Sequence, residues 1–443
     1  MFKKFKVTNF SSFRDQQTLE MTAGGTRVLN DHVVDFGNVR LLKTGVVYGA
    51  NASGKSNLIK AVDFAKKIIL KGVGNVDTYK KYFRLEKAKV DSPTKFEFEI
   101  EIEGRFYSYS FSTILRIGKI IEEWLYEIGD GKPKKIFERD KAIISLGNEL
   151  LTKDSKSRFE IYAEDMKNQS SQLFLSEIAE KDLEISGALN INKVFGWFSK
   201  KLDIVYPEDR YFGFTGVNKD LIEELSKYLG RFDTGIKEIS TIDEDFEDAL
   251  KHYPDDFKAE IIKDFSQEKV TEAAIHNSSK DGGILTLFKN SEGDIKVRKL
   301  AFIHGDDKNE AFELKDESDG TRRLLDFIPL LSKFSQGHTV LVDEFDRSLH
   351  PKLTREFFRL FHAMKQSNSQ LIVSTHESTL LDLELLRRDE IWFIEKSRDG
   401  NSKLFSLNAF NERYDKKVEK AYLLGRYGAV PVFKSFQNIS WDE

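Results

Sequence analysis

The sequence predicts an α/β fold: a mixed sheet with antiparallel amino-terminal strands, interrupted by a mainly helical insertion. Three observations lead to this prediction. Apolar and polar residues alternate in residues 2–21 and 95–128, which is typical of antiparallel strands. Residues from about 150 to 270 have mainly helical spacing. From residue 320 onward, helical segments alternate with short apolar runs, which indicates a parallel sheet with covering helices.

The individual elements follow from the same patterns. In the first third we expect a helix at 57–70 and strands at 2–10, 17–21, 42–48 and through 95–128, with a turn at Gly104. In the middle we expect strands within 284–314 and helices at 170–186, 187–204, 219–229 and 244–265. In the last third we expect strands at 338–343, 370–374 and 389–395 and helices at 320–335, 352–366 and 377–387.

Length and patterning suggest the domain organisation. At ~150 residues per domain, 443 residues favour two or three units, or one core with a large insertion. We assign 1–145 to an amino-terminal lobe, 146–280 to the helical insertion and 281–443 to a carboxy-terminal lobe. The elements of the two lobes are expected to share one sheet, because the motifs described below stand in both of them.

Composition excludes several classes of protein. The chain has no cysteine, which excludes disulfides, thiolate zinc sites and cysteine nucleophiles. The eight histidines show no metal-ligand spacing. A net charge of −4 excludes a strongly basic nucleic-acid-binding protein, although a local basic groove stays open. No stretch approaches the ~20 apolar residues of a membrane span, and residues 1–13 lack a signal-peptide core, so we expect a cytoplasmic protein without a membrane partner.

A glycine-rich loop carries the strongest functional signal. Residues 49–56, GANASGKS, fit the pattern G-x-x-x-x-G-K-[ST] between an apolar strand and an amphipathic helix. Such a loop closes backbone N–H groups around phosphate oxygens, and the alternative is a glycine-rich helix start without a ligand. Lys55 is expected to contact the β- and γ-phosphates, and the Ser56 hydroxyl to ligate Mg²⁺. We therefore expect ATP to be bound by Asn51, Ala52, Ser53, Gly54, Lys55, Ser56 and Asn57.

A second signal is the acidic end of an apolar strand. Residues 339–344, TVLVDE, end in two adjacent carboxylates. Ligands bind at the carboxyl ends of buried parallel strands, so Asp343 is placed to hold Mg²⁺. Glu344 points elsewhere and is expected to act as the general base that polarises the attacking water. The alternative is a strand followed by an acidic turn.

Two further motifs complete a resemblance to a known family. Residues 317–323, ESDGTRR, precede a helix, and Ser374-Thr375-His376 ends an apolar strand. Together with the loop and the acidic strand end, this order resembles the ATP-binding-cassette (ABC) ATPases of the SMC, Rad50, RecF and OLD branch. The resemblance implies an ABC-type P-loop ATPase head in which Ser318 and Gly320 cap the nucleotide of a second copy.

The same resemblance implies roles for three more residues. His376 becomes the switch histidine at the γ-phosphate, and Asp346 lies in the loop that joins the two active sites. Gln172 is the candidate for the family's metal-contacting glutamine. Asp319 stands where the family's Ser-Gly-Gly signature has its first glycine, which is a departure from the pattern.

More narrowly, the chain resembles the AAA15 family of bacterial ATPases, at residues 5–13, 49–57, 343–351 and 424–431. Members stand beside a second gene in anti-phage systems of the PARIS, Septu-like and abortive-infection kinds. The resemblance implies a slow ATPase that responds to a phage protein and controls a separate effector, expected to be a nuclease. It also implies a homo-oligomer, with a dimer as the minimum and a higher ring as the larger form.

Two other functions stay open at this point. One is a DNA-clamping repair or chromosome-maintenance ATPase of the RecF/SMC kind. The other is a scaffold that binds ATP with negligible turnover and stores a toxic partner. The near-neutral net charge favours a protein over DNA as the main partner.

Overall fold

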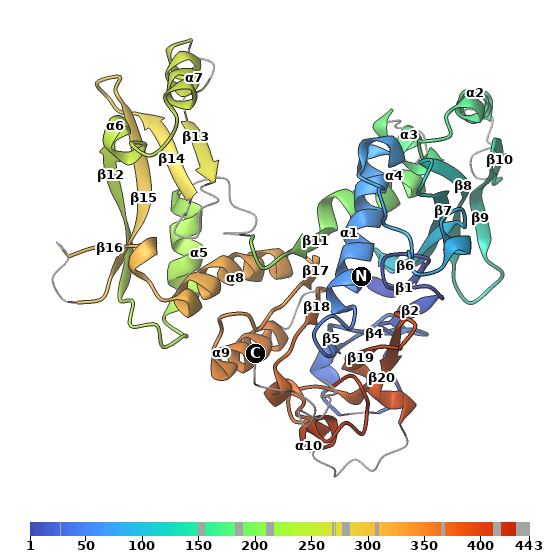
Figure 1. Ribbon diagram of the computed structural model, residues 1–443. Coiled ribbons are helices and arrows are strands. Elements are labelled where there is room, and N and C mark those ends of the chain that lie inside the picture. Colours follow the sequence, from blue (N-terminus) through green and yellow to red (C-terminus); the bar gives the residue numbers. More distant parts are fainter. Residues whose placement is uncertain are drawn as a thin grey trace, which may run out of the picture. The chain divides into compact units, whose positions relative to one another are not determined.

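The computed structural model (Figure 1) divides the chain into two compact units. The first comprises residues 1–207, 337–345 and 358–443, and the second comprises 208–336 and 346–357. The residues described are 1–26, 28–148, 156–181, 189–209, 217–267, 270, 272–276, 284–305, 310–364, 368–410 and 418–430. The boundaries of these two units differ from those of the three predicted domains, 1–145, 146–280 and 281–443. Residues up to 207 join the first unit because Phe174, Ile191 and Phe198 are buried in its core.

A six-stranded sheet lies at the centre of the first unit. Its order is β11 (Leu202–Val205), β17 (Thr339–Val342), β18 (Gln370–Ser374), β5 (Thr44–Tyr48), β19 (Ile391–Lys396) and β20 (Ser402–Ser406). Neighbouring strands are parallel except for β19 and β20. Every residue of β5, β17 and β18 is buried, as expected for strands covered on both faces. The predicted parallel sheet is confirmed, and it joins strands from both ends of the chain.

A second sheet of the first unit is antiparallel and has seven strands. Its order is β10 (Ile143–Leu146), β9 (Lys134–Asp140), β8 (Lys119–Ile128), β7 (Arg105–Ile114), β6 (Thr94–Ile102), β1 (Phe2–Thr8) and β2 (Gln17–Glu20). Buried and part-exposed residues alternate along β1 and β6, so one face packs on the core. This confirms the antiparallel strands predicted from the alternation. A separate short pair joins β3 (Val33–Asp35) and β4 (Arg40–Leu42).

Helices of the first unit pack on these sheets through apolar faces. The long helix α1 (Lys55–Lys71) buries Leu58, Val62, Ala65 and Ile69 at helical spacing. Aromatic rings fill much of the core, and Phe5 and Phe98 lie with their centroids 4.9 Å apart. The remaining helices of this unit are α2 (Lys156–Asp165), α3 (Phe174–Glu180), α4 (Leu189–Gly196) and α10 (Val418–Leu423), while α9 (Pro351–Ala363) spans both units.

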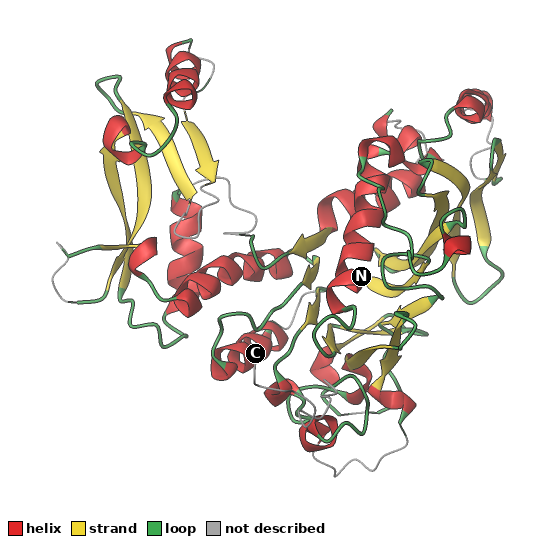
Figure 2. Cartoon of the chain, viewed as in Figure 1, coloured by secondary structure: helices red, strands yellow, loops and turns green. Residues whose placement is uncertain are grey.

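The second unit contains its own antiparallel sheet. The order is β12 (Glu238–Asp245), β15 (Ile295–Ile303), β14 (Ile284–Lys289) and β13 (Glu272–His276), and β16 (Phe312–Glu313) pairs with β15. Figure 2 shows these strands in yellow. A small core joins the sheet to two helices through Phe246, Phe265 and Leu287. The helices of this unit are α5 (Lys219–Leu229), α6 (Phe246–Ala249), α7 (Asp255–Ser266) and α8 (Asp319–Ser335).

Four predicted helices differ from the structure. In the described part of 170–186, only α3 (Phe174–Glu180) is helical. Residues 187–204 form α4, a π-helical turn and then strand β11, and residues 244–265 begin with the end of β12. Within 377–387 only the 3-10 turn Ser378–Leu380 is helical. Strand β12 is rich in acidic residues because its partner β15 is basic: Asp243 pairs with Arg298 at 2.8 Å and Glu244 with Lys299 at 2.5 Å. Among the described residues, no helix is long and apolar enough to cross a membrane.

One buried glutamine links the two sheets of the first unit and gives a stability prediction. The Gln370 amide donates to Phe2 O at 2.8 Å and to Leu42 O at 2.9 Å, and its oxygen accepts from Phe2 N. Gln370→Ala leaves these buried backbone groups without partners, so we expect a loss of ~3 kcal/mol in the free energy of unfolding. Urea denaturation measures it. The control Gln267→Ala, at an exposed helix end, is expected to change little, and an equal loss in both variants would contradict the link.

Candidate active site

The carboxyl ends of three neighbouring strands bring the predicted motifs together in the first unit. Strand β18 lies between β17 and β5. The phosphate loop follows β5, the acidic pair Asp343 and Glu344 follows β17, and His376 follows β18. Since the three strands are parallel, all these residues lie at one edge of the sheet, where α/β proteins bind ligands.

Two glycines allow the backbone conformation of the phosphate loop. A side chain at Gly49 would place its Cβ 2.5 Å from both Ile394 O and Ser53 Oγ, so only glycine fits. Gly54 has φ +118°, and a Cβ there would lie 2.6 Å from Ser402 Oγ. Ala52 also takes a left-handed conformation, with φ +61°. The sequence of small residues therefore reflects a tightly folded loop.

Lys55 is the charged centre of this loop. Its side chain is buried, and Nζ donates to Gly49 O at 2.7 Å and to Ala50 O at 3.2 Å. The ring nitrogen Nδ1 of the exposed His376 lies 3.4 Å from the same Nζ. Helix α1 begins at Lys55 with no acidic residue in its first turn and no side-chain cap. The positive end of the helix and the ammonium group therefore face the loop together, which favours an anion.

The acidic pair is held by a serine of the neighbouring strand. Ser374 Oγ donates to Asp343 Oδ1 at 2.5 Å and accepts from Glu344 N at 2.9 Å. Asp343 is buried, whereas Glu344 is half-buried and has φ +49°. This left-handed turn directs two successive carboxylates into different surroundings, which suits two different roles.

A comparison with protein families finds one match that covers most of the chain. Residues 46–382 match the family described as "AAA domain, putative AbiEii toxin, Type IV TA system". The chain belongs to this AAA domain family. With its parallel sheet and phosphate loop, it has the predicted α/β fold class with a P-loop ATPase head. No curated protein matches the sequence.

Solved structures that are similar to this AAA domain include two SMC heads. One is the "SmcHead bound to the C-winged helix domain of ScpA", with a TM-score of 0.42, 15% identity, and coverage of 91% of this chain and 97% of that chain. The other is the "SMC head domain from Thermotoga maritima", with a TM-score of 0.36, 12% identity, and coverage of 91% and 98%.

The oxygen donors of the AAA domain's site fit ATP and Mg²⁺. Ser53 Oγ is buried and has no hydrogen-bond partner among the described residues, as expected where a ligand completes the bonding. The Ser56 hydroxyl and the Asp343 carboxylate offer hard oxygen ligands for Mg²⁺. Asn51 and Ala52 are exposed at the loop tip, and Asn57 Nδ2 instead donates to Ser12 Oγ at 2.8 Å.

Ser318 and Gly320 lie in the second unit of the AAA domain, at the start of α8. Ser318 is the N-cap: its Oγ accepts from Thr321 N at 3.1 Å. A Cβ at Gly320 would lie 3.0 Å from Ser348 O, so the helix start packs closely on the loop that contains Asp346. The N-cap bond does not prevent Ser318 from contacting the nucleotide of a second copy, because a serine hydroxyl can take part in more than one hydrogen bond.

The structure corrects the prediction for Gln172. Gln172 Oε1 lies beside Gly72, which follows the last residue of α1. The phosphate loop precedes the first residue, and the 17 residues of α1 span ~25 Å. Gln172 is therefore remote from the loop and does not serve it. The sequence prediction relied on residue type alone.

Three serines that shape the site were not predicted. Ser374 joins the acidic pair, Ser402 Oγ donates to Ser53 O at 2.6 Å, and Ser12 accepts from Asn57. Ser374 could have been found, because it stands at the end of the strand that leads to His376. Ser12 and Ser402 come from distant segments, and no pattern in the sequence connects them to the loop.

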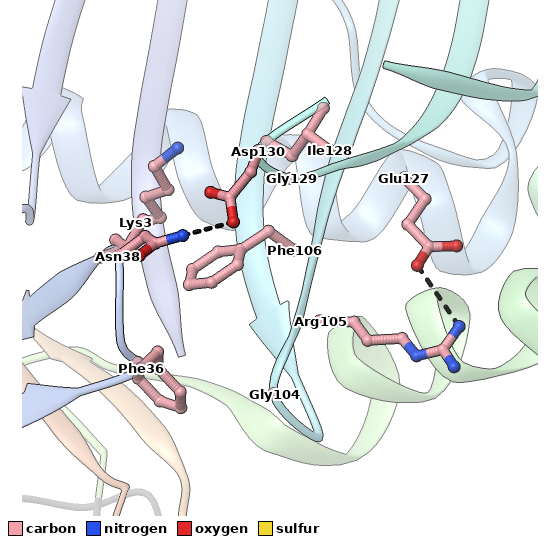
Figure 3. Close-up of a pocket in the computed structure, with 11 residues that line it drawn as sticks. Lys3, Phe36, Asn38, Gly104, Arg105, Phe106, Glu127, Ile128, Gly129 and Asp130 are labelled. Carbon is pink, nitrogen blue, oxygen red and sulfur yellow. Dashed lines mark hydrogen bonds and ion pairs between the residues drawn. The ribbon is translucent and has the colours of Figure 1, made fainter. Parts of the chain in front are cut away.

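A pocket elsewhere in the first unit has a different character. It has a volume of about 320 Å³ and lies beside the turn at Gly104 (Figure 3). Its lining has two cations, Lys3 and Arg105, and two carboxylates, Glu127 and Asp130. Arg105 pairs with Glu127 at 3.3 Å, and Lys3 pairs with Glu99 outside the lining at 2.7 Å. The pocket therefore offers no excess charge to a phosphate.

Ser374 gives a prediction for the site. Ser374→Ala removes the donor to Asp343 and the acceptor of Glu344 N, so both carboxylates lose their common support. We expect ATP hydrolysis to slow by ~10-fold or more, since the lost bond to the charged Asp343 alone costs ~1.5–3 kcal/mol. The Mg²⁺ concentration for half-maximal rate should rise as well. Steady-state kinetics test both values, and Ser335→Ala, at an exposed helix end, is the control; unchanged kinetics would contradict the role of Ser374.

Proposed function

We propose that this AAA domain is the ATP-binding and hydrolysing switch subunit of a bacterial anti-phage system, of the AAA15 kind, and acts in the cytoplasm. The observation that carries the proposal is the contact of Lys55 with His376 beside the Ser374-linked pair Asp343 and Glu344. The family description, which names a toxin and a toxin–antitoxin system, supports a function that involves a second protein.

Each residue has a defined part in the proposed reaction. Backbone N–H groups of 51–54 and the Lys55 ammonium bind and orient the phosphates of ATP. Ser56 and Asp343 hold Mg²⁺, which supplies charge neutralisation when bound. Glu344 accepts the proton of the attacking water. His376, close to Lys55, contacts the γ-phosphate and senses whether it is present.

We further propose that a complete site needs two copies, since Ser318 and Gly320 serve the nucleotide of the partner. A mixing experiment tests this. Lys55→Ala and Ser318→Arg chains should each be inactive alone. A mixture contains heterodimers with one intact site, so about a quarter of the wild-type rate should return if copies pair at random. A mixture as inactive as its components would contradict action between copies.

The proposed effector is a separate protein, expected to be a nuclease, that the ATP-bound assembly holds inactive. Affinity purification from the native host, with mass spectrometry, should recover the product of a neighbouring gene. The complex should dissociate when ATP is hydrolysed or when a phage protein is added. The contrary result is that no protein partner is recovered and that the chain binds duplex DNA in a way that requires ATP and weakens steeply with salt. That result would favour the DNA-clamping alternative.

A further inference from the structure

Two histidines and a glutamate from distant segments meet in the interior of the first unit. His32 ends a 3-10 turn (Asn30–His32), His362 lies in the last turn of α9, and Glu390 immediately precedes β19. All three side chains are buried, and their potential ligand atoms lie within 4.8 Å of one another. They form the only such group of three found among the described residues. Burying three polar, ionisable side chains costs free energy unless they bind a partner, so the cluster needs a physical explanation.

Hydrogen bonds hold all three side chains in place and leave one nitrogen of His362 without a partner in the described part of the chain. His32 Nδ1 lies 3.0 Å from both Glu390 carboxylate oxygens, and Glu390 also accepts from Arg387 N at 2.8 Å. His362 Nε2 lies 3.0 Å from Thr44 Oγ1. The other ring nitrogen, His362 Nδ1, is buried without a hydrogen-bond partner among the described residues. If Nε2 donates to Thr44, then Nδ1 carries a free lone pair.

We propose that His32, His362 and Glu390 bind a divalent transition-metal ion of the Zn²⁺ type. Two imidazole nitrogens and one carboxylate are a common zinc ligand set, which leaves a fourth position for water. Mg²⁺ and Ca²⁺ prefer oxygen ligands only, so this site is chemically distinct from the nucleotide site. Thr44 fits as the outer partner that orients a metal-binding histidine through its second nitrogen.

The electrostatics keep His362 ready to act as a ligand. Burial, first of all, and then the charges of His32 and Lys43 hold the pKa of His362 well below its usual range. The ring is therefore neutral near pH 7, which is the form that binds a metal. Burial also lowers the pKa of the nearby Lys43.

The site lies far from the phosphate loop and acts separately from it. Thr44 is the first residue of β5, whereas the loop follows Tyr48 at its other end, ~16 Å away along the strand. A metal here would join the 29–32 turn, the end of α9 and the start of β19. We assign it the role of a buried cross-link at the amino-terminal edge of the parallel sheet.

Metal binding must change the relative orientation of the His32 and His362 rings. They are stacked with centroids 3.4 Å apart and planes inclined by 5°. A metal lies in the plane of each imidazole that binds it, and two parallel planes cannot both contain one ion. Metal binding therefore has to turn at least one ring out of the stack, and proton NMR of the histidine rings should report this change.

Metal analysis of the full chain tests the proposal without any need for ATPase activity. Protein is stripped with a chelator, reloaded with Zn²⁺ and dialysed, and the metal is measured by mass spectrometry. We expect about one zinc per chain in the wild type, as for a single three-ligand site, and none in His362→Gln or Glu390→Gln. Thr44→Val keeps the three ligands and should bind zinc ~10–100-fold more weakly.

Two controls keep the result interpretable. His338→Gln removes another buried histidine, whose Nδ1 bonds Asp203 at 2.5 Å, and it should bind zinc like the wild type. Lys55→Ala should also bind zinc normally, so failure of the proposed ATPase function leaves this test intact. If His362→Gln does not fold, the zinc content of Thr44→Val decides whether the proposal stands. Wild-type protein that retains no more zinc than His362→Gln, Glu390→Gln and Thr44→Val would overturn the proposal and leave a buried hydrogen-bonded group without a metal.

Discussion

Lys55→Ala is expected to weaken ATP binding by ~100-fold or more. The reason is that the ammonium group is buried within the loop, where a hydrogen bond to a charged phosphate contributes up to ~3 kcal/mol. Its loss also leaves the carbonyl oxygens of Gly49 and Ala50 without the hydrogen bonds that Lys55 donates. Isothermal titration with Mg·ATP measures the change in dissociation constant.

The matched control is Lys67→Ala, in the same helix. Lys67 is 50% exposed and pairs with Asp63 at 2.7 Å, so its removal costs no more than a surface ion pair. We expect ATP affinity close to that of the wild type. If both variants bind ATP equally well, residues 49–57 are a glycine-rich helix start and not a phosphate loop. Circular dichroism shows whether either variant has lost its fold.

Glu344→Gln should retain ATP and lose its hydrolysis. The amide cannot accept the proton of the attacking water, and loss of a general base costs typically ~10²–10⁴-fold in rate. The substitution keeps the size of the side chain and the backbone bond from Glu344 N to Ser374. ATP affinity should therefore stay within a few-fold of the wild type, and the bound nucleotide recovered after incubation should be ATP instead of ADP.

Single-turnover kinetics with labelled ATP separate this result from its alternatives. Glu384→Gln changes an exposed glutamate of the same unit and should hydrolyse ATP at the wild-type rate. Rapid turnover by Glu344→Gln would show that another group takes the proton. Loss of ATP binding by the same variant would instead place Glu344 among the groups that hold the nucleotide.

The local parts of the site were predictable because their signals are contiguous. The strand, loop and helix around 44–71 and the apolar strand before Asp343 each have a pattern that a few neighbouring residues determine. The resemblance placed His376 at the γ-phosphate, where Lys55 was also expected, and the two lie together in the structure because parallel strands end at one edge. The roles of Ser318 and Gly320, which concern a second copy, stay predictions.

Other features depend on contacts between distant segments. The four residues of β11 are too few to break the helical pattern of 187–204, and they become a strand because β17 pairs with them. The acidic run at 243–245 is a surface feature, and its pairing with the basic residues of β15 appears only once the two strands lie side by side. His32, His362 and Glu390 have no common spacing, so only the folded chain brings them together.

The central claim is that ATP brings two copies of this chain together through their active sites. Light scattering on Glu344→Gln, with and without Mg·ATP, tests it most directly, because this variant should hold the nucleotide without consuming it. The account predicts at least a doubling of mass with Mg·ATP, no change with Mg·ADP, and no doubling when Lys55→Ala is added to the same chain. A mass that is the same under all three conditions would contradict it.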